Sequence, residues 1–291
     1  MWFHNMSMMF RYYFFKEGTR VYDKAELLTY LEAQPFMTLK NDGPIKKAYY
    51  NNTVLDFNAL FVLNTKSVIE RIERLDPKYL DLNIYVEFEV LNNTYKVEKI
   101  IDMVEIICRR FGFAVYNEYF ENVTPFKRNV LIRAFEVVKD AYKKKYEEEF
   151  LTYSRLSKDT LKSIYSFLEI KEQLDDLNDY KILDYIFLKE KDTRSAYVCI
   201  DATVDGPFII PPAAKLVKIK AKNDRGYIYI SYQDFFKKIS KYLTLVDSRL
   251  YDVFMVDEKN YKKVKKIITK TKFDEVVVYL EKIELSNVMD I

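Results

Sequence analysis

The sequence predicts an α+β protein with two mixed α/β halves, in which helices pack on sheets and a central helical segment joins the halves. Residues 83–119 carry the clearest signal, because they follow the pattern of a strand, a helix and a second strand. Apolar residues then keep helical spacing in residues 125–179, and strand patterns return after residue 180. We therefore expect an N-terminal α+β domain (1–124), a helical connector (125–179) and a C-terminal α+β domain (180–291).

Local features predict the strand–helix–strand unit. Apolar and polar residues alternate over 84–90, which is the period of a half-buried strand. The short polar side chains of 92–94 favour a helix N-terminus, and apolar residues at helical spacing follow over 97–111. Gly112 suits the left-handed residue that ends many helices, before a strand over 113–116. If the two strands are neighbours in one sheet, a right-handed crossover joins them.

Turn and capping residues place the other elements of the first half. Asp23 followed by Glu26 is a capping-box pattern, and Pro35 ends the helix that begins there. The remaining expected elements are a strand over 10–15, a hairpin of 46–50 and 54–62 around Asn51, Asn52 and Thr53, and a short helix over 66–75.

Pro125 opens the helical connector, and Ser157 caps its second helix. Beyond it, prolines and glycines separate short strand and helix patterns. The expected elements are a strand over 197–203, an irregular loop over 205–212, a hairpin of 216–221 and 227–232, a helix over 234–243, a strand over 251–256, a helix over 261–271 and a closing strand over 273–285.

Charge and cysteine content indicate the compartment. The 291 residues include 47 basic and 44 acidic ones, so the whole chain has no electrostatic footprint for nucleic acid or membrane. Cys108 and Cys199 are typical of small buried residues in a reducing compartment. Residues 1–15 lack a basic leader, and the sequence has no apolar run of about 18 residues. We expect a cytoplasmic protein without a signal peptide or a membrane span.

Several catalytic chemistries lack the residues that they require. The only histidine is His4, near the terminus, which argues against Ser-His-Asp and Cys-His pairs and against histidine-rich metal sites. The five glycines form no phosphate-binding loop or dinucleotide fingerprint. No cofactor is expected.

Two charged patterns leave alternatives open. Asp201 and Asp205 lie beside the proline loop, where carboxylates can hold a hard cation such as Mg²⁺ or act as acid and base, although Asp205 also suits a simple turn. Lysines crowd residues 259–272, where they can contact phosphate groups. The solvated face of an amphipathic helix explains these lysines more simply, so we do not expect nucleic acid as a partner.

The abundant tyrosines form the third pattern. Tyrosine is favoured at protein interfaces, but it is also a common strand residue. The tyrosines that we expect to form an aromatic binding surface are Tyr49, Tyr50, Tyr116, Tyr119, Tyr227 and Tyr229.

Four segments of the chain resemble a group of uncharacterised bacterial proteins. They are residues 23–31 (DKAELLTYL), 50–57 (YNNTVLDF), 110–117 (RFGFAVYN) and 210–217 (IPPAAKLV). The resemblance implies a cytoplasmic protein of immunity or accessory character, with no assigned activity and no catalytic residues to carry over. Thr53 and Val54 stand where the group tends to have a turn glycine, which leaves the register of that hairpin open.

The leading functional hypothesis is a non-enzymatic protein-binding module, of the toxin-immunity type, that offers an aromatic and charged surface to a protein partner. The alternative is a metal-assisted, carboxylate-based enzyme that acts on nucleic acid or nucleotides through Asp201, Asp205 and nearby lysines. Convergence of these carboxylates in one cleft favours the enzyme. The sequence makes no prediction about the oligomeric state.

Overall fold

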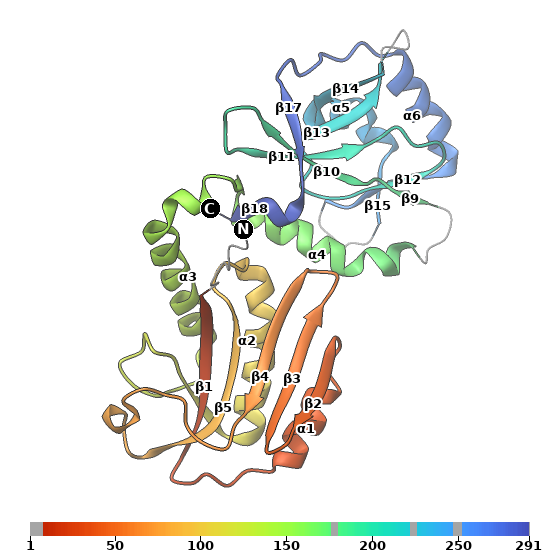
Figure 1. Ribbon diagram of the computed structural model, residues 1–291. Coiled ribbons are helices and arrows are strands. Elements are labelled where there is room, and N and C mark those ends of the chain that lie inside the picture. The colour runs from red at the N-terminus through yellow and green to blue at the C-terminus, as the bar shows by residue number, and fades with distance from the viewer. Residues whose placement is uncertain (1–7, 176–179, 222–225, 247–251, 291) are drawn as a thin grey trace. The chain divides into compact units, whose positions relative to one another are not determined.

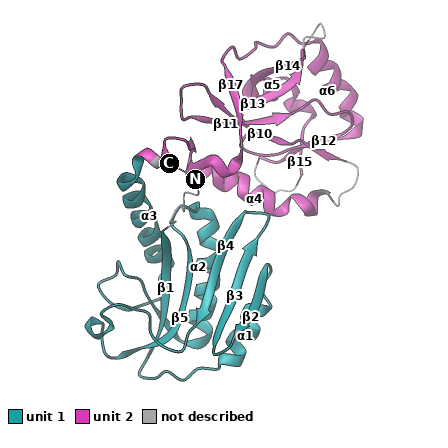
Figure 2. Ribbon diagram, in the orientation of Figure 1, with its two compact units in different colours: residues 1–147 teal, residues 148–291 magenta. Residues whose placement is uncertain are grey.

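The computed structural model has a mixed α+β fold (Figure 1). The described residues are 8–175, 180–221, 226–246 and 252–290. The chain divides into two compact units, unit 1 (Met1–Glu147) and unit 2 (Glu148–Ile291) (Figure 2). The division falls within the predicted connector, whose first helix lies in unit 1 and whose second helix lies in unit 2.

Unit 1 combines one antiparallel sheet with helices. Its strands are β1 (Met9–Glu17), β2 (Met37–Asp42), β3 (Ile45–Asn52), β4 (Phe57–Leu63), β5 (Tyr79–Glu89), β6 (Phe113–Tyr116) and β7 (Thr124–Pro125). Its helices are α1 (Lys24–Glu32), α2 (Thr94–Phe111) and α3 (Arg128–Lys145), with a 3-10 turn at Ile72–Arg74. The seven strands follow the order β2-β3-β4-β5-β1-β6-β7.

The predicted strand–helix–strand unit is present as β5, α2 and β6. Asn93 caps α2 by accepting a hydrogen bond from the Tyr95 N–H at 2.8 Å, and Gly112 ends the helix with a φ of 66°. The two strands are not neighbours, because β1 lies between them and pairs antiparallel with both. The unit is therefore a split β-α-β arrangement, so the rule for neighbouring parallel strands does not apply to it.

Aromatic side chains on one face of β1 and β5 form the main core of unit 1. The Phe88 ring centre lies 5.6 Å from that of Phe10 and 5.8 Å from that of Phe135 in α3. The buried Tyr12 hydroxyl donates a hydrogen bond to the Leu131 carbonyl at 2.7 Å. Burial raises the pKa of Tyr12, so its phenol keeps the proton that this bond requires.

A second apolar cluster covers the opposite face of the sheet near β6. Tyr13 and Phe15 of β1 pack there with Tyr116, and Ile69 and Val123 from the flanking segments complete the cluster. Both faces of β1 are thus buried, whereas the corresponding face of β2, β3 and β4 carries exposed side chains.

Several predicted elements of unit 1 differ from the structure. Residues 66–75 hold a 3-10 turn in place of a helix, because Arg71 has a left-handed backbone with a φ of 55°. The turn of the predicted hairpin lies later in the chain, since Asn51 and Asn52 belong to β3 and pair with β4. There Asn52 accepts a hydrogen bond from the Leu55 N–H at 3.0 Å. Strand β2 was not predicted.

The described residues of unit 2 form three sheets with helices packed beside them. Its strands are β8 (Ser154–Leu156), β9 (Lys181–Ile182), β10 (Tyr185–Glu190), β11 (Ala196–Asp201), β12 (Phe208–Ile210), β13 (Leu216–Lys220), β14 (Tyr227–Ser231), β15 (Thr244–Leu245), β16 (Phe254–Val256), β17 (Leu280–Ile283) and β18 (Val288–Asp290). Its helices are α4 (Lys158–Asp175), α5 (Tyr232–Ile239) and α6 (Glu258–Lys270), with 3-10 turns at Ser240–Tyr242 and Leu285–Asn287, and a further 3-10 turn at Glu147–Phe150 spans the boundary between the units. The sheet orders are β14-β13-β11-β10-β17, β15-β16-β12-β9 and β18-β8.

The largest core of unit 2 forms where the five-stranded sheet packs with α5 and α6. Ile200, Val217 and Ile230 from the sheet meet Phe235 of α5 and Val264 of α6 there. The predicted hairpin of β13 and β14 is confirmed. No helix in the described part of the chain has the length and apolar character that a membrane span requires.

Two predictions in unit 2 are wrong. The loop predicted over 205–212 contains β12, whose three residues are buried, because a short apolar run between prolines still suits a central strand. The closing strand predicted over 273–285 is limited to β17. Before β17, the chain follows β14, where the Val276 N–H donates to the Tyr229 carbonyl at 2.9 Å.

We predict that Phe88→Ala destabilises unit 1 by about 3–5 kcal/mol, because the substitution leaves a cavity among the aromatic rings of the core. Chemical denaturation followed by circular dichroism measures this change. The control, Val21→Ala, removes a side chain that is 77% exposed and should change the free energy of unfolding by less than about 0.5 kcal/mol. Equal effects of the two substitutions would contradict the assignment of Phe88 to the core.

Candidate functional site

The structure separates the predicted tyrosine surface by strand alternation. Tyr49 and Tyr50 follow each other in β3 and therefore point to opposite faces of the sheet. Tyr49 is half-buried, whereas Tyr50 is only 6% exposed and packs with Phe57. Tyr116 is also buried and lies against Tyr13. Tyr50 and Tyr116 are therefore buried among core residues, and their burial lends no support to the prediction that they belong to an aromatic binding surface.

The other tyrosines of the set are accessible. Tyr119 is exposed after β6 in unit 1. In unit 2, Tyr227 is exposed and Tyr229 is half-buried, and the Lys218 Nζ lies 4.3 Å from the centre of the Tyr227 ring. Tyr227 and Tyr229 thus lie with Lys218 on a basic and aromatic surface of β13 and β14.

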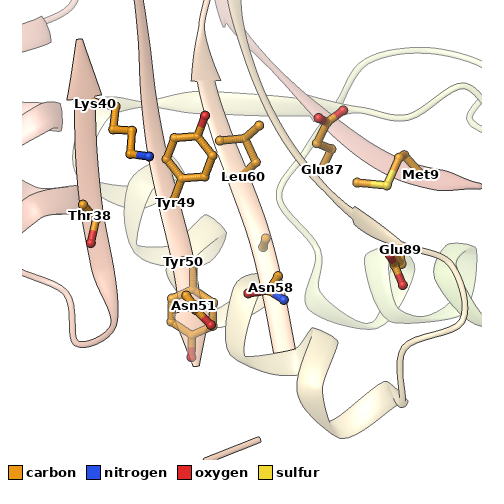
Figure 3. A pocket seen from close by; sticks show the side chains of 11 residues that line it. Met9, Thr38, Lys40, Tyr49, Tyr50, Asn51, Asn58, Leu60, Glu87 and Glu89 are labelled. Carbon is orange, nitrogen blue, oxygen red and sulfur yellow. The ribbon is translucent and has the colours of Figure 1, made fainter. Parts of the chain in front are cut away.

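Tyr49 lies in a pocket of about 480 Å³ on the open face of the unit 1 sheet (Figure 3). We call it the sheet-face pocket. Its lining residues come from β1, β2, β3, β4 and β5 and are Met9, Thr38, Lys40, Tyr49, Tyr50, Asn51, Asn58, Ala59, Leu60, Glu87 and Glu89. The face opposite to this pocket carries the buried aromatic core.

Strand register explains why these side chains gather. Tyr49 pairs with Thr38 on one side and with Leu60 on the other, and Leu60 pairs with Glu87. Residues that pair directly point to the same face of a sheet, so these four form one row across β2 to β5. Tyr49 and the half-buried Leu60 place an apolar centre in this row, with polar side chains at both ends.

The neighbouring row is polar. Asn51 pairs with Asn58, and Met9 of β1 pairs with Glu89 of β5. Both asparagines are exposed and lie opposite each other on β3 and β4 (Figure 3). Each amide offers a donor and an acceptor, so the pocket can hydrogen bond to a peptide group or to a polar side chain.

Charged groups lie at the two ends of the pocket. Glu87 accepts a hydrogen bond from Arg11 Nε at 2.8 Å, and the Arg11 guanidinium lies 5.4 Å from the centre of the Tyr85 ring. Burial lowers the pKa of Arg11, but hydrogen bonds to Glu87 and Tyr13 outweigh this effect and raise it, so the arginine stays charged. At the β2 end, the Lys40 Nζ lies 5.0 Å from the centre of the Tyr49 ring.

The pocket suits recognition by contact. It combines carboxylates, amides, a hydroxyl, an ammonium group and an apolar centre. Across the described residues, no three histidine, cysteine, aspartate or glutamate side chains are grouped so that they could hold a metal ion. His4 lies outside the described residues. Sequence reasoning found Tyr49 and the alternation that places Glu87 and Glu89 on one face of their strand, but it missed Leu60, since only the strand register brings this residue beside Tyr49.

Asp201 and Asp205 are each engaged by a different lysine. The Asp201 carboxylate accepts hydrogen bonds from Lys218 Nζ at 2.8 Å and from the Thr203 hydroxyl at 2.6 Å. Burial raises the pKa of Asp201, but the hydrogen bonds from Lys218 and Thr203 outweigh it and lower the pKa. Asp205 is exposed and accepts a hydrogen bond from Lys265 Nζ at 2.5 Å. Each aspartate therefore belongs to an ion pair within unit 2.

The lysines of 259–272 and the cysteines have structural explanations. Helix α6 buries Val264 and exposes lysines such as Lys262 and Lys266, as an amphipathic helix requires. Cys108 and Cys199 are free and buried. Burial raises the pKa of each thiol to about 12, so neither is a thiolate nucleophile at neutral pH.

Comparison with protein-family models, with curated proteins and with solved structures finds no match to this chain. The resemblance to bacterial immunity or accessory proteins therefore stays a prediction.

We predict that Asp201→Asn weakens the pH dependence of stability in unit 2. The folded-state pKa of Asp201 lies below its ordinary value of about 4. The stability that this carboxylate contributes is therefore present above that value and is lost as the pH falls through the folded-state pKa. The substitution should cost up to about 1 kcal/mol at pH 7 and less at low pH, as measured by urea denaturation across the acid range.

The matched control is Asp274→Asn, which replaces an exposed aspartate of the same unit. If both substitutions give the same change at every pH, the Lys218 ion pair does not stabilise the folded state.

Proposed function

We propose that this chain is a non-enzymatic protein-binding module, of the kind that immunity and accessory proteins represent, and that a protein partner docks in the sheet-face pocket. The observation that carries the proposal is the row Thr38, Tyr49, Leu60 and Glu87, which sets an apolar centre within a polar and charged rim on an accessible sheet face. Specific protein interfaces share this arrangement, with aromatic and aliphatic anchors at the centre and polar groups around them.

The charges of the pocket define the partner surface that fits it. Glu87 and Glu89 lie on β5, and Lys40 lies on β2, three strand spacings away in the sheet order. With spacings of about 4.8 Å, the two strands are about 14 Å apart. A complementary partner presents a basic group toward β5 and an acidic group toward β2, on either side of an apolar side chain that meets Leu60 and Tyr49.

The enzyme alternative has less support. Asp201 and Asp205 are paired with Lys218 and Lys265, and neither has two further acids beside it in the described part of the chain. The buried, unpaired thiols of the chain are typical of a reducing compartment, so the proposal places the protein and its partner in the cytoplasm.

The test begins with affinity capture of the full chain from cells that encode it, followed by calorimetry with the purified partner. We predict that Tyr49→Ala and Leu60→Ala each weaken binding about tenfold to thirtyfold, because central apolar anchors contribute most of the binding energy at such interfaces. Crosslinking from a photoreactive residue at position 58 should label the same partner.

Tyr227→Ala is the matched control, since Tyr227 is an exposed tyrosine of unit 2. It should leave the affinity unchanged. The proposal fails if capture yields no stoichiometric partner, or if the control weakens binding as much as the substitutions in the pocket.

A further inference from the structure

The two edges of the unit 1 sheet differ in their ability to accept another strand. At one edge, β7 has only two residues and one of them is Pro125, which has no N–H to donate. At the other edge, β2 is six residues long, contains no proline and, among the described strands, pairs with β3 alone. Figure 1 shows β2 as the outermost strand on that side of the sheet. An edge of this kind is a template for strand addition.

The turn that follows β2 fixes which of its backbone groups face outward. Asp42 and Ile45 flank the two-residue turn Gly43-Pro44, where Gly43 has a φ of 63°. The residues that close such a turn form a hydrogen-bonded pair. Since these pairs alternate along an antiparallel ladder, Leu39 and Asn41 turn their N–H and C=O groups away from β3.

One contact of the structure agrees with this direction. Met37, two residues before Leu39, donates its N–H to the Gln34 carbonyl at 3.3 Å and not to β3. Beyond that contact, the described residues supply no backbone partner for the outward groups of Leu39 and Asn41. The side chains of Lys40 and Asn41 are exposed, so no element of the described ranges packs over them.

The edge is continuous with the sheet-face pocket, because Thr38 and Lys40 of β2 line that pocket. A strand added to β2 places every second side chain on the pocket face, next to these two residues. Lys40 is exposed there and pairs across the ladder with Lys47, so two lysines lie side by side. An acidic side chain on the added strand is the favourable neighbour for this pair.

We propose that an extended segment of the protein partner adds to β2 as an eighth strand and places an acidic side chain beside Lys40. This inference rests on the proposed function and names the partner chemistry at one end of the same site. Main-chain hydrogen bonds to Leu39 and Asn41 hold the segment, and the charge of Lys40 selects its sequence.

Amide hydrogen exchange of the full chain, observed by NMR, tests this proposal with a synthetic peptide of alternating valine and glutamate residues. With saturating peptide, the amides of Leu39 and Asn41 should exchange about tenfold more slowly, while those of Thr38 and Lys40, which face β3, should not change. Asn41→Pro should weaken peptide binding about fivefold to tenfold, because it removes an outward donor at a position where an edge strand accepts proline. Asn41→Ala is the matched control and should bind as the wild type does.

Charge reversal provides the second variant. Lys40→Glu should reduce binding of the glutamate peptide and favour the corresponding lysine peptide. If the peptide leaves amide exchange at Leu39 and Asn41 unchanged, the proposal is wrong. It is also wrong if exchange at these two amides slows with rising protein concentration in the absence of peptide, because the edge then pairs with a second copy of the chain. If the captured partner responds to Tyr49→Ala but not to Asn41→Pro, strand addition is wrong and the binding function stands.

Discussion

Strand β1 carries large aromatic side chains on both of its faces, and both faces have to be covered. Phe10, Tyr12 and Phe14 are buried on the face of the sheet that the helices cover. Tyr13 and Phe15 are buried in the second apolar cluster. The strand meets both demands by lying between β5 and β6, where it also gains ladder hydrogen bonds along both edges. The split β-α-β arrangement suits this burial, because the position between β5 and β6 gives β1 two ladder partners and two covered faces.

The sheet-face pocket is open because the segments that bury Tyr13 and Phe15 cover only part of that sheet face. The segments that bury Tyr13 and Phe15 lie over the β6 side of the sheet, and they leave β2, β3 and β4 accessible on the same face. Arg11 stands at the border between the two regions, where it pairs with Glu87 and lies over Tyr85. One sheet face is thus a core at one end and an accessible surface, the proposed binding site, at the other.

Local chemistry in the sequence predicted much of the fold. The polar residues at 92–94 and Gly112 act within one helix, so the limits of α2 could be read directly. The insertion of β1 between β5 and β6 could not be predicted from the sequence, because it depends on pairing between distant residues, such as Phe10 with Phe88, which are 78 positions apart. For the site, composition drew attention to tyrosine, but only alternation within β3 separates Tyr49 from Tyr50. Asp201 and Asp205 suggested a metal site because their lysine partners lie far away in the sequence.

The pocket and the outer edge of the sheet share β2, so the two proposed contacts with a partner have complementary roles. Main-chain pairing to an edge strand is almost independent of sequence, so by itself it stabilises many wrong partners. The sheet-face pocket supplies side chains that a wrong partner leaves unmatched, above all the apolar centre at Leu60 and the charge of Lys40, which lies in a separate row of β2. Ordering an extended segment also costs conformational entropy, which a few edge hydrogen bonds offset only in part. Tight and selective binding at this face therefore requires contacts with the pocket as well as with the edge.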